Sequence, residues 1–149
     1  MKILSLDVST TSTGFAVINN GLVEEYGTFS YTNIDFVLRC QRMADYLSEV
    51  LEKHSDIEKV VIEELKVGKN MATVAKLAIA QGVLLRELKG IHTTFVGPTV
   101  WRRHFGINDK REEAKLKALK LVDKLGYVVK NDDEAEAILL GLFFSLKMA

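Results

Sequence analysis

The sequence is poor in the residues that build disulfide frameworks, zinc sites and membrane anchors. One of its 149 residues is a cysteine, Cys40, so no internal disulfide can form. Three histidines are scattered along the chain without the spacing of a zinc site. No apolar run approaches the roughly 20 residues of a membrane-spanning helix, and the apolar start is too short for a signal peptide. These absences predict a protein of a reducing cytoplasm, away from membranes.

An excess of either charge is also missing. Lysine and arginine together number 20, and aspartate and glutamate together number 20. A neutral total weighs mildly against nucleic-acid binding unless the charges are segregated on the surface. The sequence has no glycine-rich phosphate loop with its lysine, and no nucleophilic serine or cysteine with a partnering base. We therefore expect no nucleotide cofactor.

What the chain does contain is a regular succession of strand and helix patterns. Its length suits one domain with its own core, and Asn19-Asn20-Gly21 is a strong hairpin signal between two strand patterns. The patterns predict strands near residues 3–7, 14–19, 22–31, 60–62 and 92–96, helices at 36–53, 70–88, 110–125 and 132–147, and a loop or short helix at 99–108. Asn33 or Asp35 is expected to cap the first helix, and Asn108 or Asp109 the third.

This order predicts an α/β fold built as one domain over residues 1–149. A three-stranded meander followed by β-α-β crossovers implies a mixed sheet with helices packed against it. If the first and fourth strands are parallel neighbours, they end at the same edge of the sheet. Ligands of open α/β sheets usually bind at that edge. Asp7 and Glu63 should then meet there.

Two acidic positions close these strands, and each has an alternative explanation. Asp7 stands where the first strand should still be apolar, and a carboxylate there is costly unless it is paired. A bound cation would satisfy it, and so would a hydrogen bond from the following turn. Glu63 and Glu64 end the buried run at 60–62, and one of the two could simply face solvent.

A third acidic group opens the last helix. It contains Asp132, Asp133, Glu134 and Glu136. Acids are favoured at a helix N-terminus by about 0.3–1 kcal/mol each, which alone could explain them. The spacing adds a second interpretation, because Asp133 and Glu136 are three residues apart and share one face of the helix.

Together these positions offer four carboxylates: Asp7, Glu63, Asp133 and Glu136. Oxygen ligands without cysteine or histidine favour Mg²⁺ or Mn²⁺ over zinc. Two such ions about 3.5–4 Å apart suit phosphodiester cleavage, because one activates water and the other stabilises the leaving oxygen. The constellation therefore predicts a metal-dependent nuclease.

The same segments resemble the RuvC-type Holliday junction resolvases of the RNase H-like superfamily, particularly the small phage-encoded members. The resemblance spans nearly the whole chain in the family's order. It rests on Leu4-Ser-Leu-Asp7 with Gly14, on Val61-Ile62-Glu63 followed by Lys69-Asn70, on residues 77–85 with Gln81-Gly82, and on Asp133-Glu-Ala-Glu136-Ala137.

The resemblance implies an RNase H-like α/β fold, with a five-stranded mixed sheet of order 3-2-1-4-5 and helices on both faces. It also implies a homodimer that nicks two opposed strands of four-way DNA junctions with Mg²⁺, two ions per site. It assigns the metal ligands and catalytic roles to Asp7, Glu63, Asp133 and Glu136. It favours Glu63 over Glu64 and, through the three-residue spacing, Asp133 over Asp132. The chain departs from bacterial members in two places: Glu136 stands where aspartate is usual, and Lys66 stands where an aromatic residue is usual.

Basic residues near these acids are candidates for DNA contacts. The candidates are Lys66, Lys69, Arg102, Arg103, Lys110 and Arg111. Such side chains give salt-dependent, sequence-neutral affinity for phosphates, although each could also be an ordinary solvated charge. Trp101 is as well suited to packing as to base stacking. The wide apolar stripe of the helix at 70–88 predicts either deep burial or a partner, and we take it as the candidate dimer interface.

The leading hypothesis is thus an endonuclease that resolves four-way junctions and also forks or other branched DNA. A non-cleaving branched-DNA binding protein is the first alternative. An RNase H-like nuclease acting on RNA is the second. The non-cleaving binding protein would give no cleavage products. The RNA-directed nuclease would cleave structured RNA in preference to branched DNA.

Overall fold

The computed structural model describes residues 1–32, 34–68 and 70–148, and these form five strands and five helices. The strands are β1 (Lys2–Val8), β2 (Ser12–Asn19), β3 (Leu22–Ser30), β4 (Lys59–Glu63) and β5 (His92–Val96). The helices are α1 (Phe36–Lys53), α2 (Met71–Glu87), α3 (Pro98–His104), α4 (Arg111–Lys124) and α5 (Asp132–Met148). Among the described residues, no helix combines the length and the apolar character that a bilayer crossing requires.

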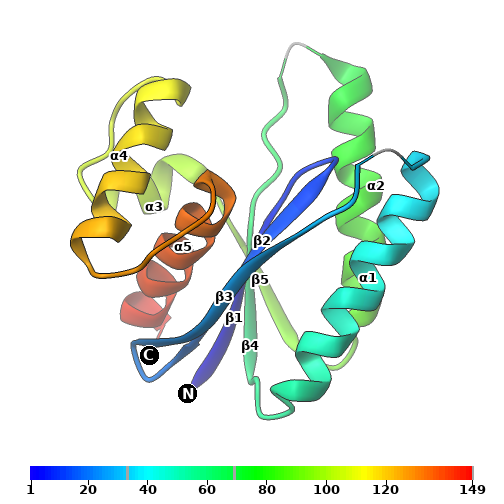
Figure 1. Ribbon diagram of the computed structural model, residues 1–149, viewed down its shortest axis with the longest axis horizontal. Coiled ribbons are helices and arrows are strands. Elements are labelled where there is room, and N and C mark those ends of the chain that lie inside the picture. The colour runs from blue at the N-terminus through cyan, green and yellow to red at the C-terminus, as the bar shows by residue number, and fades with distance from the viewer. Residues whose placement is uncertain (33, 69, 149) are drawn as a thin grey trace.

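The strands form one mixed sheet of order β3-β2-β1-β4-β5, which confirms the predicted order. The hairpins make β1–β2 and β2–β3 antiparallel, whereas β1–β4 and β4–β5 are parallel. As predicted, helices cover both faces: α1 and α2 lie on one side, and α3, α4 and α5 on the other (Figure 1). Each face has its own buried cluster of apolar side chains.

The alternation of side chains along β1 decides which residues face which layer. Leu4 and Leu6 belong to the apolar cluster beneath α1 and α2, whereas Ile3 belongs to the cluster beneath α5. Because successive side chains of a strand point to opposite faces, Ser5 and Asp7 lie on the same face as Ile3. The sequence pattern of β1 therefore places Asp7 on the α5 side of the sheet.

Two glycines let α5 lie directly against the sheet. A Cβ atom at Gly14 in β2 would lie 2.2 Å from the carbonyl oxygen of Asp133. A Cβ atom at Gly141 in α5 would lie 2.8 Å from Ile18 and 3.0 Å from Ser5. Any larger residue at either position would push helix and sheet apart. This close packing fixes the depth at which the acidic start of α5 sits.

The helix caps agree in part with the sequence predictions. Asp35 caps α1 by accepting a hydrogen bond from the Leu38 amide at 3.0 Å, while the alternative cap, Asn33, lies outside the described residues. The predicted caps of α4 are wrong, because the cap position is Lys110 and no side chain caps there. Asp109 instead forms an ion pair with Lys117 of α4, with an N···O distance of 2.5 Å.

The apolar stripe of α2 is mostly uncovered in the single chain. Of its described side chains, Ala80, Gln81 and Leu84 are buried. An exposed face remains, which we call the α2 outer face: Met71, Ala75, Ala78, Ile79, Gly82 and Leu85. Deep burial within the monomer, one of the two predicted explanations of the stripe, is therefore wrong.

Candidate active site

Asp7 and Glu63 come together because their strands are parallel and in register. The last paired residues of β1 and β4 in this ladder are Leu6 and Ile62. Asp7 and Glu63 follow directly, and both side chains project from the face that α5 covers. Asp7 is buried, at 8% exposure, so the end of the strand carries a carboxylate shielded from solvent.

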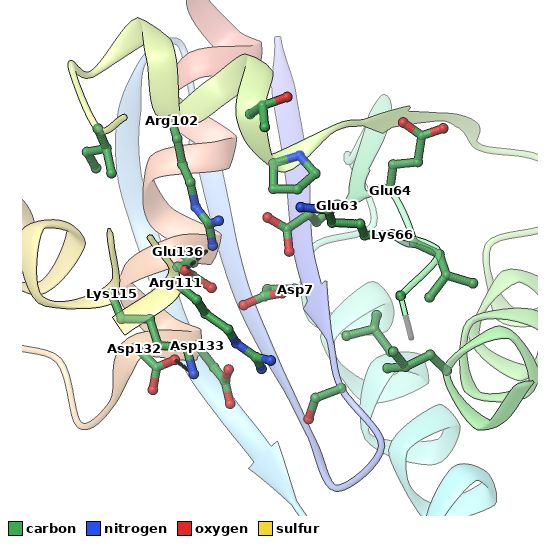
Figure 2. A pocket seen from close by; sticks show the side chains of 18 of the residues that line it. Asp7, Glu63, Glu64, Lys66, Arg102, Arg111, Lys115, Asp132, Asp133 and Glu136 are labelled. Carbon is green, nitrogen blue, oxygen red and sulfur yellow. Dashed lines mark hydrogen bonds and ion pairs between the residues drawn. The ribbon is translucent and has the colours of Figure 1, made fainter. Parts of the chain in front are cut away.

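The third member of this group comes from α5. Glu136 is buried one turn into the helix, and one oxygen of each of Asp7, Glu63 and Glu136 lies within 4.8 Å of the other two. Figure 2 shows the three carboxylates converging from β1, β4 and α5. We call these residues the carboxylate cluster. Glu64, the alternative to Glu63, is exposed at the margin of the same cleft.

Asp133, the fourth predicted carboxylate, lies beside the cluster and is held by a different partner. Its Oδ2 accepts a hydrogen bond from the Ser12 hydroxyl at 2.6 Å. Its neighbour Asp132 pairs with Lys115 at 3.3 Å. Glu134 turns the other way and is buried, where it accepts hydrogen bonds from Thr28 and the Lys130 amide. Of the acids that open α5, Glu136 alone joins the three-residue cluster.

Two consecutive residues of α3 donate hydrogen bonds to the cluster. Trp101 is fully buried, and its indole Nε1 donates to Glu63 Oε1 at 2.9 Å. The Arg102 guanidinium donates to Glu136 Oε1 at 2.7 Å. The short helix α3 therefore connects the acid that ends β4 with the acid of α5. Burial assigns Trp101 to packing and to holding Glu63, because a buried indole cannot stack on a base.

Crowding and burial change the proton affinity of these acids. Burial raises the pKa of Asp7 well above its usual range, and the charges of Glu63 and Glu136 raise it further. Burial also raises the pKa of Glu63, against the opposing effects of the Trp101 hydrogen bond and the Arg102 charge. The pKa of Asp133 is raised by burial and lowered in part by the Ser12 hydrogen bond. In each case the protein environment disfavours the ionised carboxylate.

This donor set fits a divalent metal ion. Three converging carboxylate oxygens without a nitrogen or sulfur ligand are the ligands that Mg²⁺ and Mn²⁺ prefer. The pKa of Asp7 is raised first by burial and then by the negative charges of Glu63 and Glu136. A cation of charge two would relieve that repulsion and would favour the ionised acids.

The carboxylate cluster lines a cleft of about 1010 Å³. The predicted DNA-contacting residues Lys66, Arg102, Arg103, Lys110 and Arg111 also line it, and we call these five the basic rim. In Figure 2 the side chain of Arg102 points into the cleft from α3, and that of Arg111 from the start of α4. The neutral total charge thus conceals a local gathering of basic side chains around acidic ones. Lys69, the sixth candidate, lies outside the described residues.

Sequence reasoning missed the residues that hold the carboxylates. Ser12 in β2 and Trp101 in α3 each bond to a predicted acid that is far away in the chain. Arg102 was predicted as a phosphate contact, and in the structure it forms an ion pair with Glu136. The sequence around Trp101 and Arg102 does not reveal these partners, because the bonds to Glu63 and Glu136 depend on how α3 is placed against β4 and α5.

Comparison with known proteins places the chain in a family. A family model described as Lactococcus phage M3 protein matches residues 1–144. The chain belongs to this family. The matched residues include the carboxylate cluster and the two glycines, Gly14 and Gly141, that bring α5 close to the sheet.

This M3-family chain is also similar to curated RuvC proteins, which confirms the resemblance seen in the sequence. It is 36% identical over 92 residues to the crossover junction endodeoxyribonuclease RuvC of Bdellovibrio bacteriovorus, covering 58% of this chain and 54% of that protein. The chain thus matches about half the length of that relative. It is 26% identical over 146 residues to the RuvC of Fusobacterium nucleatum, covering 93% of this chain and 76% of that protein.

A solved structure confirms the fold class. The Thermus thermophilus RuvC in complex with a Holliday junction substrate matches with a TM-score of 0.78 at 19% identity. The match covers 98% of this chain and 95% of that chain. The M3-family protein therefore has the RuvC variant of the RNase H-like fold.

Proposed function

We propose that this protein is a metal-dependent endodeoxyribonuclease that resolves four-way DNA junctions, and cuts other branched DNA such as forks, by paired nicking. The observation that carries the proposal is the convergence of Asp7, Glu63 and Glu136 on a cleft with a basic rim. Similarity to RuvC proteins over 93% of the chain supports DNA junctions as the substrate class. The proposed catalytic unit is one domain of residues 1–149, acting in the cytoplasm of a bacterial host.

In this proposal Asp7, Glu63, Asp133 and Glu136 hold two Mg²⁺ ions, for which Mn²⁺ can substitute. The ions would supply an activated water and stabilise the leaving oxygen of the phosphodiester. Asp7 and Glu63 contribute ligands from rigid strand ends, and Asp133 and Glu136 from one face of α5. Ser12 orients Asp133 and Trp101 orients Glu63 through hydrogen bonds. Because these side chains are already held in place, they lose little conformational freedom when they bind a cation.

The DNA contacts in this proposal come from the basic rim and from Lys69. The side chains of the basic rim reach the phosphate backbone and position the duplex arm over the carboxylate cluster without reading its sequence. Lys66 follows Glu63 by three residues and lies at the cleft, where it would contact a phosphate next to the cut strand. Trp101 takes no part in base stacking, since it is buried.

Paired nicking requires two active sites, so we propose a homodimer formed through the α2 outer face. This face exposes Ile79 by 54% and Met71 by 63%, and a Cβ atom built at Gly82 meets no described atom within 4 Å. Small residues beside exposed apolar ones allow two helices to approach closely. A two-fold axis through this face would match the symmetry of a four-way junction.

The experiment that tests the substrate class compares four nucleic acids under one condition. An immobile four-way junction, a fork, a linear duplex and a structured RNA, each end-labelled, are incubated with the protein in Mg²⁺ or EDTA. We expect symmetric nicks in the junction, slower cleavage of the fork and an intact duplex, with Mg²⁺ only. Cleavage of the RNA with an intact junction would replace the proposal with the RNA-directed alternative.

A further inference from the structure

The ion pair between Arg102 and Glu136 joins a basic-rim residue to a proposed metal ligand. Both residues are largely withdrawn from solvent, with side-chain exposures of 20% and 6%. The described residues give the Arg102 guanidinium a single hydrogen bond, at 2.7 Å, and its Nε is buried without a partner among them. A guanidinium bonds a carboxylate best through two parallel hydrogen bonds. The pair is therefore close but incompletely satisfied.

The surroundings favour a change of partner for Arg102. Its guanidinium lies 5.2 Å from the ring centre of Trp101, whose own position is fixed by the bond to Glu63. The side chain crosses the cleft from α3, so a phosphate lying there would be within reach of the same atoms (Figure 2). A divalent cation bound to Glu136 would at the same time compete with the guanidinium for the carboxylate.

We propose that Arg102 is an exchangeable counter-cation. In the metal-free protein it neutralises Glu136, and when a divalent cation takes Glu136 it transfers to a phosphate of the bound DNA. This inference rests on the proposed function. It makes the binding of cation and DNA mutually reinforcing, because each ligand takes one partner of the ion pair and leaves the other free.

The exchange predicts opposite effects on the two ligands when the charge of Arg102 is removed. In Arg102→Gln, the cation no longer competes with a guanidinium, so Ca²⁺ should bind the DNA-free protein more tightly. The junction should bind less tightly in the presence of Ca²⁺, because one phosphate contact is lost. The factor by which Ca²⁺ strengthens junction binding should fall about fivefold or more, which is the low end of typical coupling between sites.

The test measures both affinities in the chain of residues 1–149. Calorimetric titration gives the Ca²⁺ affinity without DNA, and fluorescence anisotropy of a labelled junction gives the DNA affinity with Ca²⁺ or EDTA at constant ionic strength. A gel verifies that the DNA stays intact. Arg103→Gln is the matched control, since Arg103 is an exposed residue of the basic rim without an ion pair among the described residues. It should weaken DNA binding and leave the Ca²⁺ affinity and the coupling factor unchanged.

A conservative variant separates charge from folding. Arg102→Lys keeps the charge and should keep most of the coupling, and a circular dichroism spectrum verifies that each variant is folded. Weaker Ca²⁺ binding by Arg102→Gln, or an unchanged coupling factor, would overturn the exchange and leave Arg102 as a fixed positioning residue. Absence of Ca²⁺ binding by the unmodified protein would overturn the metal site itself, and with it both proposals.

Discussion

Gly14 and Asp133 are packed so closely that the glycine hydrogen of β2 faces the carbonyl group of α5. A Cβ atom at Gly14 would lie 2.2 Å from the carbonyl oxygen of Asp133 and 2.5 Å from its carbonyl carbon. Both obstacles are backbone atoms, so no rotamer change can relieve the clash. The start of α5, with Asp133 and Glu136, must move for any side chain to fit.

Gly14→Ala should therefore destabilise the protein and weaken its metal site. We expect a loss of about 1–3 kcal/mol in the free energy of unfolding, as for an overpacked core. Gly68→Ala is the control, because a Cβ atom there meets no described atom within 4 Å, so the free energy of unfolding should change by less than about 0.5 kcal/mol. Thermal unfolding of both variants measures the difference. Equal stability of Gly14→Ala and the unmodified protein would contradict the packing.

Asp7→Asn should raise the stability of the metal-free protein. The pKa of Asp7 is raised in the folded protein, so its favourable contribution is present below the unfolded pKa and is lost as the pH rises through the folded value. At neutral pH, where the carboxyl group is ionised in the unfolded chain, this raised pKa makes folding less favourable, and an amide at this position removes that cost. We expect the variant to gain about 1 kcal/mol, a rise of roughly 2–4 °C in Tm for a chain of this size.

The control for this measurement is Asp123→Asn, the same chemical change at an exposed position of α4. It should change the free energy of unfolding by less than about 0.5 kcal/mol. Added Mg²⁺ should raise the Tm of the unmodified protein and of Asp123→Asn, but not that of Asp7→Asn. A fall in Tm on Asp7→Asn in EDTA would show that the carboxylate stabilises the fold.

Metal affinity should depend on pH in a range where ordinary carboxylic acids do not titrate. Burial raises the pKa values of Asp7 and Glu63, and both must lose their protons to hold a cation. Mg²⁺ affinity, measured by calorimetry, should therefore fall as the pH drops toward the ordinary value of about 4. In Trp101→Phe the decline should begin at higher pH, because the lost hydrogen bond favours ionised Glu63. A pH-independent affinity between about pH 5 and 8 would contradict the raised pKa values.

The proposed dimer can be separated from the fold by one substitution on the α2 outer face. Ile79→Glu places a charge on a residue that is 54% exposed in the single chain, so the monomer should stay folded while the interface is lost. Leu116→Glu is the matched control, at 57% exposure on α4. Sedimentation analysis should find a dimer for the control and a monomer for Ile79→Glu. A dimer in both variants would place the interface elsewhere.

The sequence patterns predicted the order of the elements along the chain, and the meeting of Asp7 with Glu63 followed on the condition, met in the structure, that the first and fourth strands are parallel neighbours. The predicted order of the elements rests on local patterns: the short apolar run at the start of β1, the β-branched run Val60–Ile62 in β4 and the turn at Asn19-Asn20-Gly21. They succeed because strand burial and hairpin turns are decided by neighbouring residues. The predicted strand at residues 92–96 agrees residue for residue with β5.

What the sequence could not predict depends on contacts between distant elements. Asn108 and Asp109 looked like caps of α4, yet Asp109 is held by Lys117. The hydrogen bonds of Trp101 to Glu63 and of Ser12 to Asp133 join residues that are 38 and 121 positions apart. Nothing in the local spacing around Trp101 or Ser12 identifies such partners. The acids of the site were thus visible in the sequence, and the groups that orient them were not.

The most direct test of the whole account is cleavage of an immobile four-way junction by the unmodified protein and by Asp7→Asn, side by side with Mg²⁺. We predict paired symmetric nicks for the unmodified protein, and for Asp7→Asn binding of the junction without product. Cleavage by Asp7→Asn would contradict the role of the carboxylate cluster. A stable complex without product from the unmodified protein, in both Mg²⁺ and Mn²⁺, would instead show a branched-DNA binding protein.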